Sequence, residues 1–233
     1  MTSSQHERLH IAIIPDGNRR WAREHGFGEV WKGHEKAVEN FRTLADWCLK
    51  SGEVSTLTIW CFSTENWKRA TIEVEMLMKL FEKFLQTQRE YFQEKNIRFV
   101  HSGRRDRLSK KLIALIASLE EETKENTTFT LHLAVDYGGK DEVTRAVQRM
   151  IAKKVDADAI TESLIAENLD HPELPPIDVI LRSSGEQRTS NFFLFQAAYS
   201  EWVFSPKHFP EITTDDLRLT IDEFLSRKRR FGG

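Results

Sequence analysis

Short apolar runs alternate with longer amphipathic segments along this 233-residue chain. Six runs are rich in β-branched residues and short enough to be strands. They cover 10–14, 57–62, 97–101, 129–135, 177–181 and 202–204. Helical patterns occupy the intervening segments 35–50, 74–94, 108–122, 141–153 and 159–168. Nearly continuous apolar strands separated by helices predict an α/β fold with a mostly parallel six-stranded sheet covered by helices.

Composition narrows the class of protein. The length fits a single domain over 1–233, in which we expect 1–9 to be flexible and 227–233 to form a C-terminal tail. Lys and Arg total 34 against 36 Asp and Glu, which argues against a nucleic-acid partner. Cys48 and Cys61 lack the spacing of a disulfide framework or a zinc site. The chain has no long apolar run, so we expect a cytoplasmic protein that touches membranes only at the periphery.

Charged and polar residues follow three of the predicted strands. Asp16 follows the first strand, 63–69 follow the second and 182–190 follow the fifth. Ligands of such sheets bind beyond the carboxyl ends of the strands. The sequence therefore predicts that these three segments meet in one site.

Residues 182–190 carry two guanidiniums and a hydroxyl close together, from Arg182, Arg188 and Ser190. Groups of this kind form a fork for a phosphate or diphosphate. A solvated charged loop is the ordinary alternative. A second segment of similar character, PDGNRRW at 15–21, favours the binding site.

In that second segment, Gly17 permits a tight turn, and the helix that follows offers free N–H groups to an anion. Arg19 and Arg20 add charge-assisted bonds. The alternative is that Asp16 only caps the helix.

The sequence of segment 63–69 supports two interpretations equally. Ser63 and Asn66 can position a diphosphate oxygen or a reacting proton, while Trp67 can cover an apolar chain. The sequence Ser-Thr-Glu-Asn also favours an ordinary turn with an N-cap.

These motifs together resemble the cis-prenyltransferases, and most closely undecaprenyl diphosphate synthase and its medium-chain relatives. The pattern runs from His10 to the terminal RRFGG. The resemblance implies condensation of isopentenyl diphosphate with an allylic diphosphate, expected to be farnesyl diphosphate. The product would be a medium-chain Z-polyprenyl diphosphate such as undecaprenyl diphosphate. Alternatives are a short-chain Z-prenyl diphosphate synthase and a non-catalytic accessory subunit of the same fold.

The resemblance also implies roles for individual residues. Asp16 and Asn66 would be catalytic, and Asp16 with Glu201 would hold Mg²⁺. A homodimer is implied, in which Arg230 and Gly232 of the tail reach the partner's diphosphate site. The expected substrate contacts are Gly17, Asn18, Arg19, Arg20, Trp21, His34, Ser63, Thr64, Glu65, Trp67, Arg69, Arg182, Arg188, Thr189 and Ser190.

The chain departs from the family pattern before His34, where an arginine is usual. Lys32 is the only cation among 29–32, and Arg19 is the expected replacement. Asp136 stands where Asn is common, Ala70 where Pro is usual and Gln187 where some members have His.

Residues 74–94 carry one wide apolar face, formed by Leu77, Leu80, Phe81, Phe84, Leu85, Tyr91 and Phe92. Such a face is ordinarily core, whereas the resemblance implies a hydrophobic tunnel beside the sheet. Cys61 and Phe84 would then form the tunnel floor and limit product length. Neither the GxxxxGK[ST] motif of a nucleotide kinase nor the DDxxD motif of a trans-prenyltransferase occurs.

Overall fold

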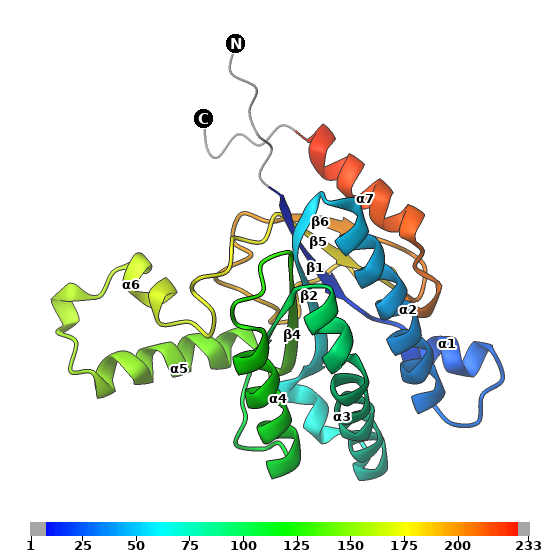
Figure 1. The fold of residues 1–233 in the computed structure, drawn as a ribbon, viewed down its shortest axis with the longest axis horizontal. Coiled ribbons are helices and arrows are strands. Elements are labelled where there is room, and N and C mark those ends of the chain that lie inside the picture. The colour runs from blue at the N-terminus through cyan, green and yellow to red at the C-terminus, as the bar shows by residue number, and fades with distance from the viewer. Residues whose placement is uncertain (1–7, 228–233) are drawn as a thin grey trace.

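The computed structural model describes residues 8–227, which form a six-stranded sheet in which every pair of neighbouring strands is parallel (Figure 1). The strand order is β3-β4-β2-β1-β5-β6. The strands are β1 Leu9–Ile14, β2 Val54–Ser63, β3 Ile97–Ser102, β4 Phe129–Tyr137, β5 Val179–Arg182 and β6 Glu201–Phe204. All six predicted strands are confirmed, and the sheet is wholly parallel.

Helices connect the strands from β1 to β5, because parallel neighbours need long crossover connections, whereas a loop without a helix joins β5 to β6. They are α1 Asn18–Glu24, α2 Trp31–Ser51, α3 Thr71–Glu94, α4 Lys110–Thr123, α5 Gly139–Ala152, α6 Glu162–Glu167 and α7 Thr214–Ser226. Three short 3₁₀ helices complete the fold: η1 Thr64–Lys68, η2 Ala157–Ala159 and η3 Phe209–Glu211. The sequence patterns did not predict α7.

The N-terminal boundary lies earlier than expected. Leu9, predicted to be flexible, opens β1, and the Arg8 guanidinium donates to the carbonyls of Val54 and Thr128 at 2.7 Å each. The tail residues Arg230 and Gly232 lie outside the described residues.

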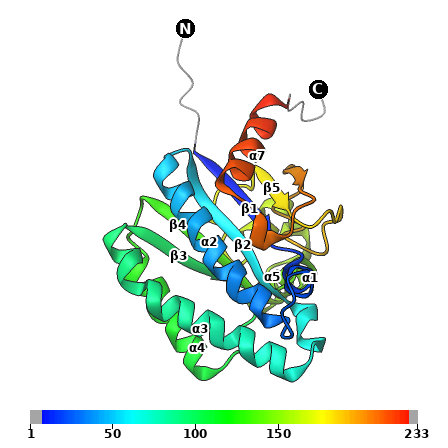
Figure 2. The ribbon, with the colours of Figure 1, turned by 90° about the vertical axis from the view of Figure 1, so that its right-hand side faces the viewer.

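Apolar side chains of the strands pack into two cores, one on each face of the sheet. Ile11 and Ile13 belong to the larger core, which includes side chains of α2, α3, α4 and α7. Ala12 and Ile14 face the other side, where Phe192 from the loop after β5 packs. Figure 2 shows α2 lying across the sheet with α3 beside it, while α5 and α6 extend away in Figure 1. Coverage of both faces explains why most strand residues are apolar.

The strand order reverses at β1, which has β2 on one side and β5 on the other. Ile14 pairs with Arg182 at the carboxyl ends of β1 and β5. A crevice at this kind of switch point is the usual ligand site of an open parallel sheet. Asp16 and Arg182 both lie there.

The outer edge of β3 is covered by side chains. The Thr123 hydroxyl accepts from Phe99 N at 3.0 Å, and Glu120 accepts from His101 N at 3.1 Å. His171 Nε2 donates to the His101 carbonyl at 3.0 Å. Backbone groups that would otherwise be open at this edge are therefore satisfied. Within residues 8–227, no helix is long and apolar enough to cross a membrane.

Candidate active site

Asp16 lies at the centre of the site, and both of its carboxylate oxygens accept hydrogen bonds. Arg182 Nη2 donates to Oδ2 at 3.0 Å, and Gly17 N donates to Oδ1 at 2.7 Å. Burial alone would raise the pKa of Asp16, but these bonds and the charges of Arg182 and Arg20 together hold the pKa below its usual value. The carboxylate is therefore anionic and joins the segments that follow β1 and β5.

Gly17 makes the turn after Asp16 possible. Its φ is +89°, and a Cβ there would lie 2.4 Å from His208 Nδ1 and 2.5 Å from Ser184 Oγ. Only glycine fits both the left-handed backbone and the close approach. The turn starts α1 directly beside the carboxylate.

A polar pocket of about 330 Å³ lies beside Asp16. It is lined by Pro15, Asp16, Gly17, Asn18, Arg19, Arg20, Arg23, His34 and Arg69. Four guanidiniums stand against one carboxylate, so the pocket suits an anion. We call it the polar pocket.

Unpartnered polar atoms gather in and beside the polar pocket. Buried atoms without a hydrogen-bond partner include Asn18 Oδ1, Arg19 Nε, His34 Nε2 and Arg182 Nε. Buried polar atoms nearly always have partners, so the three nitrogens, which can donate, fit a ligand with several acceptor oxygens. Burial, with the charges of Arg69 and Arg19, lowers the pKa of His34 to about 3, which keeps its imidazole neutral.

Glu73, in the first turn of α3, is a buried carboxylate that the sequence analysis missed. Its Oε1 lies 3.1 Å from Arg69 Nη1, 3.7 Å from Arg19 Nε and 3.9 Å from His34 Nε2. It is 4 % exposed. Glu73 therefore holds cations from α1 and from the segment after β2 in place around the polar pocket. The only sequence signal was its i,i+4 spacing from Arg69.

Arg182 and Ser190 form part of the predicted fork. Arg182 is buried, and its Nη1 donates to Ser190 Oγ at 2.7 Å and to the Arg188 carbonyl. The Arg188 side chain is exposed and pairs with Glu186, which also lies 3.1 Å from Arg20 Nη1.

The backbone of this loop is strained. Ser190, Asn191 and Phe193 all have positive φ, of 51°, 70° and 37°. Such conformations are costly and concentrate at functional sites. Thr189 is exposed on the same loop.

The segment after β2 adopts the capped turn that was one of its two readings. Ser63 N donates to Asn66 Oδ1 at 3.0 Å, and the Ser63 side chain caps the N–H of Asn66 in return. Glu65 accepts from Asn191 Nδ2 at 3.3 Å, and a Cβ on Gly138 would lie 2.7 Å from Thr64 Oγ1. The turn is thus packed against the loop after β5, so the structure brings together all three predicted segments.

Trp21 and Lys32 lie away from the polar pocket. The Trp21 ring stacks on His25 at 4.3 Å and on Phe27 at 5.6 Å, and it lines neither the polar pocket nor the apolar cavity described below. Lys32 pairs with Glu35 at 2.9 Å. Arg23, not predicted, lines the polar pocket and adds to the cations supplied by Arg19 and Arg20.

Glu201 lies at the wrong end of the sheet to share a metal ion with Asp16 of the same chain. It opens β6 level with Val179, which pairs with Ile11, whereas Asp16 follows the far end of β1. At 3.3 Å per residue the separation along the strands is roughly 15 Å. Glu201 instead accepts from Arg227 Nη1 at 2.6 Å. No group of three or more His, Cys, Asp or Glu side chains among residues 8–227 is arranged to hold a metal.

An apolar cavity of about 60 Å³ adjoins the polar pocket. Pro15, Asn18 and His34 line both spaces. The cavity lies between α2, α3 and the sheet, and its further lining residues include Ile59, Cys61, Leu77, Leu80, Phe81 and Leu133.

A larger cavity of about 410 Å³ lies further along α2 and α3. Phe41 and Phe84 line both cavities, with ring centroids 5.8 Å apart. We call these two rings the Phe41–Phe84 partition.

Residues 14–232 match the family model described as putative undecaprenyl diphosphate synthase. The chain belongs to this family. Isoprenyl transferase of Rhodopirellula baltica is 41% identical over 228 residues, covering 96% of this chain and 93% of the relative. Isoprenyl transferase of Wolinella succinogenes is 41% identical over 227 residues, covering 97% of each. The chain is therefore a prenyl transferase.

Solved structures agree with this family assignment. Lavandulyl diphosphate synthase from Lavandula x intermedia, in complex with dimethylallyl diphosphate, superposes with a TM-score of 0.91 at 33% identity. That match covers 96% of this chain and 98% of the other. A probable undecaprenyl diphosphate synthase from Campylobacter jejuni gives a TM-score of 0.81 at 33% identity, covering 97% and 99%. The prenyl transferase fold thus extends over nearly the whole chain.

Proposed function

We propose that the enzyme condenses isopentenyl diphosphate with an allylic diphosphate to a Z-polyprenyl diphosphate. The observation that carries this proposal is the continuity of the polar pocket with the apolar cavity through Pro15, Asn18 and His34. A prenyl diphosphate has this same division into a charged head and an apolar chain. Arg182, Arg188 and Ser190 would bind the diphosphate of isopentenyl diphosphate on the other side of Asp16.

The reaction follows from these positions. The C4 carbon of isopentenyl diphosphate forms a bond to the allylic carbon, the allylic C–O bond breaks, and a proton is lost from C2. Negative charge grows on the departing diphosphate, where the cations around the polar pocket stabilise it. His34 is neutral and can donate or accept a hydrogen bond there. Asn66 is the proposed residue for proton handling.

Magnesium fits Asp16, because Mg²⁺ prefers one or two carboxylates together with substrate phosphates. When bound, it would neutralise charge on the diphosphate. The Asp16 carboxylate is anionic and partly exposed, as a ligand must be.

The proposed role of Glu201 requires a homodimer. Glu201 contacts Arg227, the last described residue, and Arg230 and Gly232 follow in the sequence. We propose that Glu201 and the tail of one subunit approach the diphosphate site of a second copy. This arrangement removes the conflict that the distance within one chain creates.

For product length we propose a medium chain near undecaprenyl, built on farnesyl diphosphate. A short-chain product is the second candidate, because the Phe41–Phe84 partition closes a cavity of only about 60 Å³. An accessory subunit is disfavoured, since Asp16 and Arg182 are present and hydrogen-bonded to each other. Cytoplasmic location, with membrane contact only at product release, accompanies this proposal.

Product analysis tests the proposal. The protein is incubated with Mg²⁺, labelled isopentenyl diphosphate and allylic primers of increasing length, with Asp16→Ala as the control. Incorporation by the wild type alone, into products with cis double bonds, supports it. If the wild type incorporates no label with any of the primers, a non-catalytic accessory subunit is the better description of this protein.

A further inference from the structure

Asp136, at the carboxyl end of β4, is a fully buried carboxylate with three donors. Arg107 Nε donates to Oδ2 at 2.8 Å, and Arg107 Nη2 donates to Oδ1, so the guanidinium binds in a two-pronged manner. Trp67 Nε1 donates to Oδ1 at 2.8 Å. The Asp136 backbone has a φ of +54°, a left-handed conformation in which Asp is enriched.

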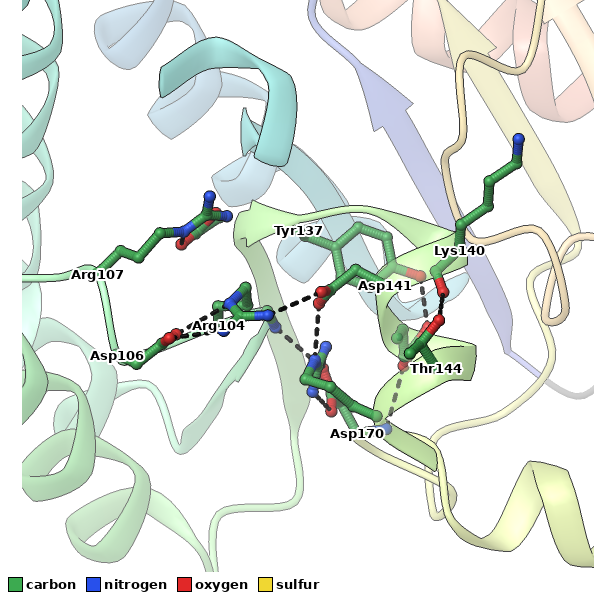
Figure 3. A network of polar contacts seen from close by, with 12 residues as sticks. Arg104, Asp106, Arg107, Tyr137, Lys140, Asp141, Thr144 and Asp170 are labelled. Carbon is green, nitrogen blue, oxygen red and sulfur yellow. Dashed lines mark hydrogen bonds and ion pairs between the residues drawn. The ribbon is translucent and has the colours of Figure 1, made fainter. Parts of the chain in front are cut away.

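Arg107 comes from the loop between β3 and α4, which Figure 3 shows beside the start of α5. The loop is fixed to β4 by its backbone. Arg104 N donates to the Asp136 carbonyl at 3.0 Å, and a Cβ on Gly103 would lie 2.1 Å from the Val135 carbonyl oxygen. The Arg104 side chain also bridges Asp106 and Asp141 (Figure 3). Arg107 therefore projects from a rigid support.

Trp67 is held on several sides. The Arg107 guanidinium lies 5.4 Å from the centroid of its ring, a cation–π distance, and Phe62 meets the ring edge-on at 5.2 Å. Trp67 belongs to η1, directly after Asn66, and Arg69 of the polar pocket follows two residues later. Fixing the indole therefore fixes the segment that carries both residues.

We propose that Arg107 and Asp136 are positioning residues, which hold the segment 63–69 against the active site through the indole of Trp67. Neither residue lines the polar pocket or the apolar cavity. A 3₁₀ turn of five residues has poor hydrogen-bond geometry and needs support from its side chains. The proposal rests on the proposed function, since the segment matters there through Asn66 and Arg69.

The competing explanation is that the ion pair only stabilises the fold. A buried carboxylate that loses its partner destabilises a protein, and activity would then fall because less of the enzyme is folded. The test therefore uses a variant that keeps the charge. Arg107→Lys retains a cation near Asp136 but loses the two-pronged bond and the planar group over the ring.

Arg105→Lys is the matched control. Arg105 lies on the same loop and binds Glu120 with two hydrogen bonds, and its side chain is 36% exposed against 37% for Arg107. Both variants and the wild type are assayed well below their unfolding temperatures. We expect kcat to fall about tenfold or more in Arg107→Lys and to change less than about twofold in Arg105→Lys.

Trypsin cleavage gives a readout independent of turnover, because the segment contains Lys68 and Arg69. We expect cleavage after these residues to be about fivefold faster in Arg107→Lys than in the wild type, and unchanged in the control. Asp136→Asn keeps Oδ1, which accepts from Trp67 and from Arg107 Nη2, but loses the charge and the Oδ2 acceptor of Arg107 Nε. This variant should show a smaller increase in cleavage, and it replaces Arg107→Lys if that variant does not fold.

Equal loss of kcat in Arg107→Lys and Arg105→Lys, or wild-type cleavage after Lys68 and Arg69 in the Arg107 variant, would overturn the inference. An inactive wild-type enzyme would instead overturn the proposed function, while the cleavage comparison would still test how the segment is held.

Discussion

Replacing Phe84 with alanine should lengthen the product. Phe84 is 7% exposed and shares the partition with Phe41, between cavities of about 60 and 410 Å³. Without its ring, the smaller cavity opens into the larger one. A prenyl chain that stops at the ring in the wild type could then continue along α2 and α3.

The magnitudes favour a large effect. With Phe84 present, another isoprene unit must overpack the core at a cost of about 1–3 kcal/mol. With alanine, burial of its five carbons contributes roughly 4 kcal/mol, at about 0.8 kcal/mol for each CH₂. If a methylene takes about the volume of a water molecule, roughly 30 Å³, a cavity of 410 Å³ holds roughly two to three isoprene units. We therefore expect the product of Phe84→Ala to be longer by roughly two to three isoprene units.

The assay extends farnesyl diphosphate with labelled isopentenyl diphosphate and measures product length by mass spectrometry. Phe99→Ala is the matched control, because Phe99 is 1% exposed, stacks on Phe92 at 6.0 Å and lines neither cavity. Both variants should lose stability, by about 3–5 kcal/mol. Unchanged length in Phe84→Ala, or equal lengthening in the control, would refute the reasoning.

Four other outcomes are expected. Asp16→Ala should reduce kcat about a thousandfold with the fold intact, and activity above about a tenth of the wild type would contradict its role. Arg182→Ala should raise KM for isopentenyl diphosphate more than KM for the primer in steady-state assays, and equal increases would show that the two sites are misassigned. Glu201→Ala should raise the Mg²⁺ concentration required for half activity, and an unchanged metal titration would leave Glu201 only its ion pair with Arg227. Burial lowers the pKa of His10 to about 4, so between pH 6.5 and 4 the unfolded state binds the extra proton. The free energy of unfolding should therefore decrease as the pH is lowered from 6.5 to 4, by up to about 1.4 kcal/mol per pH unit for this group. In denaturant titrations, His10→Asn should make the free energy of unfolding depend less on pH. If the substitution leaves the pH dependence of the free energy of unfolding unchanged, the lowered pKa of His10 is not its cause.

The strands were predictable because a parallel sheet buried on both faces leaves a short, continuous apolar run. The ends of the strands were harder to predict, because β2 begins at Val54 and includes the polar residues Ser55 and Thr56. Helix α7 was missed although its signals were present: Leu217, Ile221 and Phe224 lie at helical spacing, and Thr213 forms a capping box with Asp216.

The site was predictable to the extent that strand ends define it. Asp16 and Arg182 meet because β1 and β5 are neighbours. Glu73 was not predictable, because its contacts depend on how α3 packs near α1. Glu201 precedes its predicted strand instead of following it, so strand direction already placed it at the opposite edge of the sheet from Asp16 of the same chain.

The covered edge of β3 has a consequence for assembly. Thr123, Glu120 and His171 occupy backbone groups that a strand from another molecule would need. A strand of another molecule therefore cannot pair with β3 and extend the sheet, although β3 is not shortened. A transferase crowded among copies of itself can keep a six-residue border strand and still resist fibre-like stacking there.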